Sequence, residues 1–335
     1  MTRISGIAVL LLFLAACNNP KNIDEAVSTP AAPAEPALVT VPAFNTDSAY
    51  SYVKAQVDFG PRTPNSVAHD KCATWLANKL KAWADTVYIQ KYTATAFDGL
   101  KMKSTNIIAA INPQATTRVF ISSHWDTRPI ADEDDHDRDK PINGADDGGS
   151  STAVAMEIAR TIHQQRPEIG VDIILFDSED YGQPDDSKLP KMQDSWCLGS
   201  QYWASHPHVG GYRADFGINL DMVGTADAAF PREGVSATMA DWVSQYVWHT
   251  AERLGYSSLF VNRIFGQVTD DHYYVNQIIH IPTVDVIRYG EDGFGHHHHT
   301  HKDNLDLISK NTLDAVGKVM VQVIYQYNAE KAKKS

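Results

Sequence analysis

The sequence predicts a single α/β domain in which helices cover both faces of a mostly parallel sheet. Short β-rich or apolar runs alternate along the chain with longer segments whose apolar residues recur every three or four positions. Strands that alternate with helices in this way form a parallel sheet between two helical layers. Once an N-terminal segment is set aside, about 290 residues remain, a length that fits one large domain better than two.

The predicted elements follow one another in a regular order. Helical spacing is present at 48–59, 69–84, 150–165, 242–254 and 313–327. Strands are predicted first at 86–92, 105–111 and 118–122, and then in the more continuous apolar runs 171–176, 216–220 and 283–287. Continuous apolar runs are typical of strands that are covered on both faces, as expected inside a helical sandwich.

The first 17 residues are typical of a bacterial lipoprotein signal peptide. Arg3 gives a positive start, an apolar run follows at 7–14, and Leu14 to Cys17 resembles a lipobox whose cysteine becomes lipidated. The run is too short to span a bilayer. Residues 18–42 are rich in Ala and Pro and predict an extended tether, which leaves the folded domain at 43–335. Asn18 after the cysteine favours the outer membrane, on its periplasmic face or at the cell surface.

Charge and cysteine content narrow the classes of function. The formal net charge is -12, and the predicted domain has no basic cluster. Nucleic-acid binding requires a positive surface to neutralise phosphates, so the composition argues against it. Besides Cys17 the chain has Cys72 and Cys197, neither in a paired-cysteine metal spacing. These two residues could form one disulfide in an exported protein, but the sequence does not reveal whether they meet.

Candidate chemical residues follow the predicted strands directly. His124 and Asp126 come after the strand at 118–122, residues 177–180 after 171–176, and Asp221 after 216–220. A Gly-flanked acidic turn lies at 143–149, and a histidine run lies at 296–301. The carboxyl ends of parallel strands meet at one edge of a sheet, where sites form. Imidazole and carboxylate groups together suit zinc, and paired carboxylates allow one to bind metal while its neighbour moves protons.

Five separated motifs resemble, in order, the metal-site motifs of the zinc aminopeptidase superfamily. They are His124-x-Asp126, Gly144 to Asp147, Ser178 to Asp180, Asp221, and His299-Thr300. The resemblance spans roughly residue 46 to the C-terminus and implies a zinc exopeptidase-like fold. It also implies that Asp147, Asp180 and His299 hold zinc and that Glu179 is the acid/base. Many relatives have Glu where this chain has Asp180. Within the histidine run, His298 and His301 are the alternatives to His299.

Three further features resemble the bacterial glutaminyl cyclases of this superfamily. Thr269 to His272 is similar to the cyclase signature, which implies that Asp270 shares a proton-bearing hydrogen bond with Asp221. Asp194 to Ser200 is similar to the segment that places an aromatic wall at the pocket, here Trp196, and Phe294 matches a second pocket aromatic. Alternatively, Trp196 is a core residue and Asp270 lies in a solvated turn. Ser123 replaces the cysteine of animal cyclases, which points to the bacterial branch.

The resemblance implies one zinc ion per chain and conversion of N-terminal glutamine in peptides or proteins to pyroglutamate, with release of ammonia. One alternative is a two-zinc aminopeptidase, in which His124 and Asp221 fill a second metal position. The other is a non-catalytic scaffold of the same fold, although every ligand position carries a competent side chain. The sequence does not predict the physiological substrates or the oligomeric state.

Overall fold

The computed structural model describes residues 37–333, and the chain from Leu38 onward forms one compact unit. The predicted signal peptide and the tether up to residue 36 lie outside the described residues. In the part of the chain that is described, no helix is both long and apolar enough to cross a membrane. The last predicted tether residues lie against the domain: Val39 N–H donates to Gln326 at 3.1 Å, and Gln322 donates to the Val39 carbonyl at 3.1 Å.

Within residues 37–333 the main sheet has six strands in the order β1-β2-β4-β3-β5-β8. Their bounds are β1 Thr86–Thr95, β2 Lys101–Ile111, β3 Arg118–His124, β4 Gly170–Phe176, β5 Phe216–Asp221 and β8 Thr283–Ile287. The pairs β4–β3, β3–β5 and β5–β8 are parallel, whereas β1–β2 and β2–β4 are antiparallel. The sheet is therefore mixed but mostly parallel. Two short strands, β6 Phe230–Arg232 and β7 Phe260–Ile264, pair separately.

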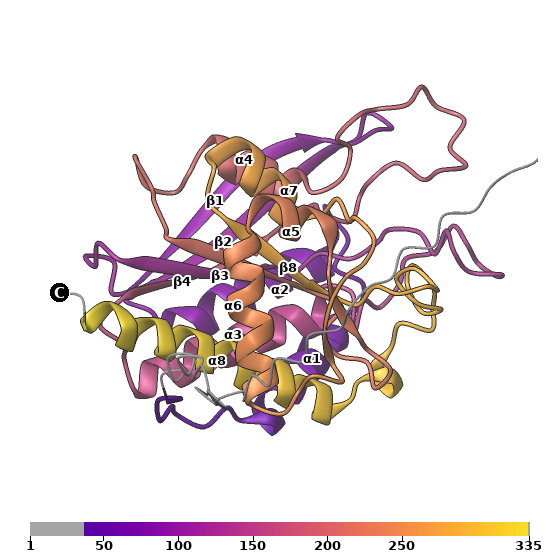
Figure 1. The fold of residues 1–335 in the computed structure, drawn as a ribbon. Coiled ribbons are helices and arrows are strands. Elements are labelled where there is room, and N and C mark those ends of the chain that lie inside the picture. Colours follow the sequence, from indigo (N-terminus) through magenta and orange to yellow (C-terminus); the bar gives the residue numbers. More distant parts are fainter. Residues whose placement is uncertain (1–36, 334–335) are drawn as a thin grey trace, which may run out of the picture. The chain divides into compact units, whose positions relative to one another are not determined.

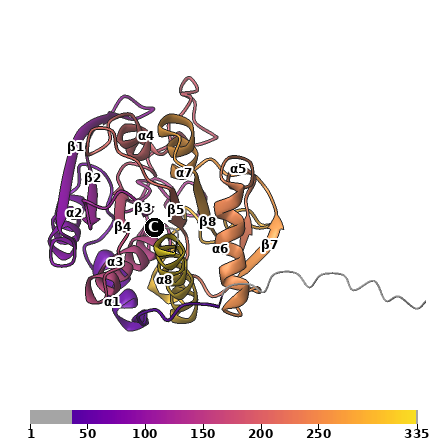
Figure 2. The ribbon, with the colours of Figure 1, turned by 60° about the vertical axis from the view of Figure 1, so that its left-hand side comes forward.

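Helices cover both faces of the sheet (Figure 1). The main α-helices are α1 Thr46–Asp58, α2 Val67–Lys81, α3 Gly149–Gln164, α4 Leu198–Ser205, α5 Gly234–Met239, α6 Asp241–Arg253, α7 Asp271–Tyr274 and α8 Lys310–Ala332. A π-helical turn, η1 Val275–Ile279, continues α7, and a 3-10 turn, η2 Leu305–Leu307, precedes α8. Figure 2 shows β1 and β2 at one edge of the sheet and β8 at the other, followed by α6 and β7.

Alternation along the central strands divides the core into two layers. Val119 and Ile121 of β3 pack in the larger cluster, which α1, α2, α3, α6 and α8 complete. Phe120 points to the opposite face, where it meets Phe176 of β4 and Trp203 of α4. Successive side chains point to opposite faces of the sheet, and both sets are apolar here. Both faces of these strands are therefore buried. The arrangement confirms the predicted fold class.

All predicted helices and strands are present, with ends that differ by a few residues. Side-chain caps fix several helix starts: Asn45 accepts from Ser48 N–H, Ser66 from His69 N–H and Ser309 from Thr312 N–H. The two cysteines of the domain, Cys72 and Cys197, are both free and buried, so the disulfide left open by the sequence is not formed.

Candidate active site

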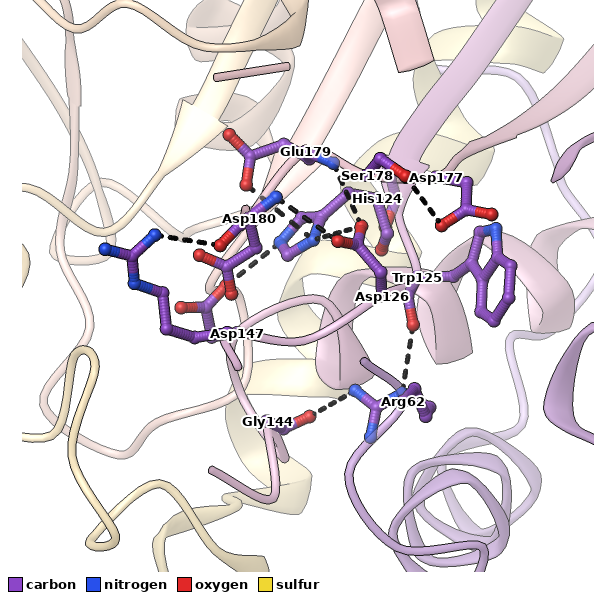
Figure 3. A network of polar contacts seen from close by, with 12 residues as sticks. Arg62, His124, Trp125, Asp126, Gly144, Asp147, Asp177, Ser178, Glu179 and Asp180 are labelled. Carbon is purple, nitrogen blue, oxygen red and sulfur yellow. Dashed lines mark hydrogen bonds and ion pairs between the residues drawn. The ribbon is translucent and has the colours of Figure 1, made fainter. Parts of the chain in front are cut away.

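The predicted site residues lie at the carboxyl edge of the sheet. His124 ends β3, Asp221 ends β5, and residues 177–180 follow β4 directly. Because β3 lies between β4 and β5 and runs parallel to both, the three strand ends deliver these side chains to one place. Figure 3 shows four of these side chains gathered close together, namely His124, Asp147, Glu179 and Asp180.

Asp147, Asp180 and His299 form a group whose ligand atoms lie within 4.8 Å of one another. The His299 Nε2 atom lies 3.1 Å from Asp180 Oδ1 and 3.7 Å from Asp147 Oδ2. Both carboxylate oxygens of Asp180 are buried without a hydrogen-bond donor. Burial, together with the charge of Asp147, raises the pKa of Asp180 well above its ordinary value. A cation between these groups would remove that penalty, so the donor set fits a metal ion.

The imidazole of His299 is in the form that a metal ligand requires. Burial and the nearby Arg128 guanidinium lower the pKa of His299 to about 4, so its ring is neutral at physiological pH. On the other side of the ring, Nδ1 lies 3.5 Å from Asp132 Oδ1. Asp132 in turn accepts hydrogen bonds from Arg128 at 3.0 and 2.6 Å. A carboxylate behind a histidine ligand is a common means of orienting its ring.

The other histidines of the run point elsewhere. His297 Nε2 lies 2.9 Å from Asp146, His298 Nδ1 lies 3.0 Å from Glu133, and His301 Nδ1 lies 2.9 Å from Asp134. His298 stacks on His299 at 3.6 Å and joins Glu133 and His299 in a second, partly exposed candidate group. Of these histidines, the structure brings only His299 to Asp147 and Asp180.

A second buried group combines His124, Asp147 and Asp221. His124 Nε2 lies 3.0 Å from Asp147 Oδ1 and 3.2 Å from Asp221 Oδ1. Burial alone would lower the pKa of His124, but the surrounding carboxylates of Asp126, Asp147 and Asp221 raise it well above its ordinary value. The imidazolium ion can therefore bridge the two carboxylates by itself. These are the residues that the two-zinc alternative assigns to a second metal.

Glu179 lies between the candidate metal ligands Asp147, Asp180 and His299 and the thiol of Cys197. Its Oε1 accepts a hydrogen bond from Cys197 Sγ at 3.1 Å, and its Oε2 lies 3.9 Å from His124 Nδ1. Burial and the charge of Asp180 raise the pKa of Glu179 well above its ordinary value, although His124 opposes the shift. Raised carboxyl pKa values beside a metal position are typical of groups that exchange protons.

Asp221 and Asp270 lie near each other but bind different partners. Asp270 accepts from Asn219 Nδ2 at 2.7 Å and from its neighbour's backbone N–H. Burial raises the pKa of Asp221 to about 7, with a contribution from the charge of Asp270. Within the described residues, no hydrogen bond joins these two carboxylates directly. The proton-bearing bond expected between them therefore stays a prediction.

A cavity of about 560 Å³ opens in front of these groups, and Asp147, Glu179, Asp221 and Asp270 line it. Trp196 lines one side, with its ring parallel to that of His299 at 5.7 Å and 9°. Its indole packs so closely on Gly182 that a β-carbon there would lie 1.8 Å from the ring.

Phe294 also lines the cavity, stacked on His298 at 4.7 Å. It belongs to the segment just before the histidine run, so its ring and that of His299 reach the cavity from one loop. Both predicted aromatics are therefore partly buried at the cavity rather than in the core.

Two carboxylates hold the site loops by their backbones. Asp126 accepts from the N–H groups of Glu179 and Asp180 at 3.1 and 3.3 Å. Asp303 accepts from the N–H groups of Asp146 and Asp147 at 2.7 and 3.1 Å. We call Asp126 and Asp303 the amide-binding carboxylates. Asp126 belongs to the His124-x-Asp126 motif, but nothing in the sequence indicates that it or Asp303 binds backbone amides.

Arg62 adds a third anchor that the sequence analysis missed. Its buried guanidinium donates to the carbonyls of Trp125 and Gly144 at 2.9 and 2.7 Å (Figure 3). It also donates to the carbonyl of Asn143 at 2.8 Å. It thus joins the segment after β3 to the acidic turn. A charged residue between two prolines, as in Pro61-Arg62-Thr63-Pro64, was the available signal. Arginine is rarely buried without partners, but its partners here lie about 60 to 80 positions away in sequence.

Left-handed backbone conformations occur beside the reactive groups. Ser178, which precedes Glu179, has a φ of 60°, Met222, which follows Asp221, has 50°, and His299 itself has 51°. Such conformations are disfavoured for residues with a β-carbon and cluster at functional sites.

The mixed α/β sheet, with carboxylates and an imidazole gathered at its carboxyl edge, defines a protein of the exopeptidase fold class with a candidate metal site. Comparison with known proteins agrees. Residues 106–324 match peptidase family M28, and the chain belongs to that family.

Several solved structures are similar to the chain over nearly their whole length. Bacteroides thetaiotaomicron glutaminyl cyclase, bound to N-acetylhistamine, is 45% identical with a TM-score of 0.84, covering 85% of this chain and 99% of its own. Tannerella forsythia glutaminyl cyclase is 46% identical with a TM-score of 0.83 and the same coverage.

Among curated proteins, bovine glutaminyl-peptide cyclotransferase is 27% identical over 255 residues, which is 66% of each chain. The Bacillus subtilis aminopeptidase YwaD is 26% identical, over 67% of this chain and 44% of its own. The chain thus spans about two thirds of the length of the bovine relative.

Proposed function

We propose that this protein is a zinc-dependent glutaminyl-peptide cyclotransferase, which converts N-terminal glutamine of peptides or proteins to pyroglutamate and releases ammonia. The observation that carries the proposal is the position of Glu179: its carboxylate lines the cavity next to the Asp147, Asp180 and His299 group. This arrangement supports proton transfer beside a candidate metal site. The likeness to bacterial glutaminyl cyclases at 45 and 46% identity supports the same activity.

The proposed metal ligands are Asp147, Asp180 and His299. Zinc held there would supply Lewis-acid chemistry toward the side-chain carboxamide of the substrate. Glu179 takes a proton from the α-amino group of the glutamine, whose nitrogen then attacks the carbonyl carbon (Cδ) of the side-chain carboxamide. A C–N bond forms within the substrate, the bond to the carboxamide nitrogen breaks, and Glu179 returns the proton to the departing ammonia. The reaction consumes no water.

Asp221 and Asp270 are proposed to stabilise the charge that develops during attack, or to relay protons. Both carboxylates line the cavity, and Asn219 fixes the orientation of Asp270. We assign Trp196 and Phe294 to the substrate pocket, where flat apolar walls would hold the glutamine side chain folded toward its own amine. Holding reacting groups in a near-attack arrangement is a large source of rate enhancement for intramolecular reactions.

A two-zinc aminopeptidase is the second candidate, and the His124, Asp147 and Asp221 group is the observation that favours it. In that reaction Glu179 would act on a water molecule instead of the substrate amine, and a free amino acid would be released. Metal content separates the two candidates, since the peptidase predicts two zinc ions per chain and the cyclotransferase predicts one.

The proposal is tested with the chain from residue 38 onward, which retains the whole compact unit. Loaded with zinc and given a glutamine-initiated dipeptide, the protein is expected to remove one ammonia from the intact dipeptide, as seen by mass spectrometry. Glu179→Gln should lower this rate at least about 100-fold because general acid/base catalysis is lost. Glu252→Gln, on an exposed face of α6, is the matched control. Release of free glutamine would refute the proposal in favour of the aminopeptidase.

We also propose that the protein is exported and anchored to lipid through Cys17, on the periplasmic face of the outer membrane or at the cell surface. The support is the lipobox-like sequence ending at Cys17. Mass spectrometry of the full-length protein from bacterial membranes tests this proposal. A diacylglyceryl group on Cys17 is expected, and an N-terminus that begins elsewhere without lipid would contradict the proposal.

A further inference from the structure

A buried thiol contacts the proposed acid/base, and the chemistry above gives it no role. Cys197 Sγ lies 3.1 Å from Glu179 Oε1 and 3.9 Å from Asp270 Oδ1. Glu179 and Asp270 line the cavity, whereas the Cys197 side chain is fully buried. The thiol therefore meets the carboxylate from the protein side and is not available to the substrate.

The backbone holds this thiol in place. Cys197 N–H donates to the Glu179 carbonyl at 2.9 Å, and Leu198 N–H donates to the Ser178 carbonyl at 3.1 Å. Cys197 itself has a left-handed φ of 56°, which is unfavourable for a residue with a β-carbon. Ser178, on the opposite segment, has a left-handed φ of 60°. Two strained and mutually bonded segments thus fix the direction in which the thiol points.

The contact restrains one oxygen of Glu179 and leaves the other available. Oε1 accepts from the thiol, while Oε2 lies 3.9 Å from His124 Nδ1, beyond hydrogen-bond distance. A carboxylate that is held at one oxygen cannot rotate freely about its terminal bond. A thiol is a weak donor, so it can orient the carboxylate without competing strongly with a proton for it.

We propose that Cys197 is a positioning residue that orients the Glu179 carboxylate for proton transfer to and from the substrate nitrogen. This inference rests on the proposed cyclotransferase function. It differs from a packing role because the chemistry of the side-chain donor, and not only its volume, sets the rate. Serine preserves the donor, whereas alanine removes it.

Steady-state kinetics with a glutamine dipeptide test the role in the zinc-loaded protein that begins at residue 38. Cys197→Ala is expected to lower kcat about tenfold with little change in KM, because orientation affects the chemical step more than binding. Cys197→Ser should recover most of that loss. Cys72→Ala is the matched control, since Cys72 is equally buried but lies in α2, away from the cavity. Equal losses in the alanine and serine variants at Cys197, or no loss in either, would overturn the proposal.

Infrared spectroscopy of the S–H stretching band tests the contact independently of activity. In the Cys72→Ala background the chain from residue 38 carries one thiol, that of Cys197. Its band should move to higher frequency in Glu179→Gln, because a neutral amide oxygen accepts a weaker hydrogen bond than a carboxylate. An unmoved band would overturn the thiol–carboxylate contact. A moved band with no pyroglutamate formed by the wild-type protein would instead refute the proposed function, and with it the catalytic role of Cys197.

Discussion

Replacing Asp126 by asparagine is expected to destabilise the fold and the site together. Its two oxygens accept from two successive backbone N–H groups, those of Glu179 and Asp180, and its side chain is fully buried. Asparagine offers one acceptor oxygen, so its NH₂ group faces the second N–H group. One buried donor loses its partner, at a cost of about 1–3 kcal/mol, and the remaining bond loses its charge assistance, at a cost of about 1 kcal/mol.

Removing a buried charge also removes part of its desolvation penalty, which offsets some of this loss. We therefore expect the free energy of unfolding to fall by about 2 kcal/mol, the lower end of the summed range. Urea denaturation in the presence of EDTA measures this change without a contribution from bound metal. Activity should fall as well, because the backbone that carries Glu179 and Asp180 loses its support.

Asp58→Asn provides the matched control. Asp58 forms an exposed ion pair with Lys54 one helical turn away, at 2.6 Å. Pairs of this kind contribute at most about 0.5 kcal/mol. If Asp126→Asn were no more destabilising than Asp58→Asn and retained full activity, the assignment of Asp126 as an amide-binding carboxylate that supports the site would be wrong.

Three further outcomes follow from the same structure. His299→Ala should abolish zinc retention after dialysis, measured by plasma mass spectrometry, whereas His301→Ala should retain the metal. His208 accepts from Trp203 Nε1 at 3.1 Å, and burial with the Arg118 charge lowers its pKa from 6.5 to about 4. Only the unfolded chain takes up this proton as the pH falls from 6.5 to 4, so stability should drop there by up to about 3 kcal/mol. In EDTA, His208→Gln should lack that portion of the drop; an unchanged profile would contradict the shift. Gly144→Ala should lower the free energy of unfolding by more than about 2 kcal/mol in urea, because φ is 59° and a β-carbon would lie 2.3 Å from a neighbouring methyl carbon; a change under about 0.5 kcal/mol would show that the turn relaxes.

Patterns with a clear period predicted most of the fold. The run Ile173 to Phe176 is apolar at every position because β4 is covered on both faces, and its position in sequence is therefore visible. The direction of β1 and β2 cannot be predicted from the sequence, since an antiparallel edge pair has the same composition as a parallel one. Short elements were also missed. β6 has three residues, including Pro231, and α4 contains Gly199 and two serines, all weak signals for their class.

Some residues of the candidate site could likewise be predicted from the sequence, and others could not. Side chains that follow apolar strands, such as His124 and Asp221, could be located because chain position places them at the sheet edge. The resemblance assigned His299 within the run 296–301 and left His298 and His301 as alternatives. Only the coordinates show which ring meets Asp147 and Asp180, because one residue of displacement presents a different ring to them. Asp303 and Arg62 were missed because their partners are backbone groups of distant segments, and backbone groups leave no mark on the sequence.

The amide-binding carboxylates have a consequence for how such an enzyme changes over generations. Asp126 and Asp303 accept hydrogen bonds from backbone N–H groups. A backbone N–H group is the same whichever side chain its residue carries. A mutation at a cavity-facing position therefore changes a side chain that can meet the substrate, but it leaves these backbone hydrogen bonds intact. Cavity-facing side chains can therefore differ between related proteins while the loops keep the same backbone anchors. The chain is similar both to an aminopeptidase and to glutaminyl-peptide cyclotransferases, as such a scaffold permits.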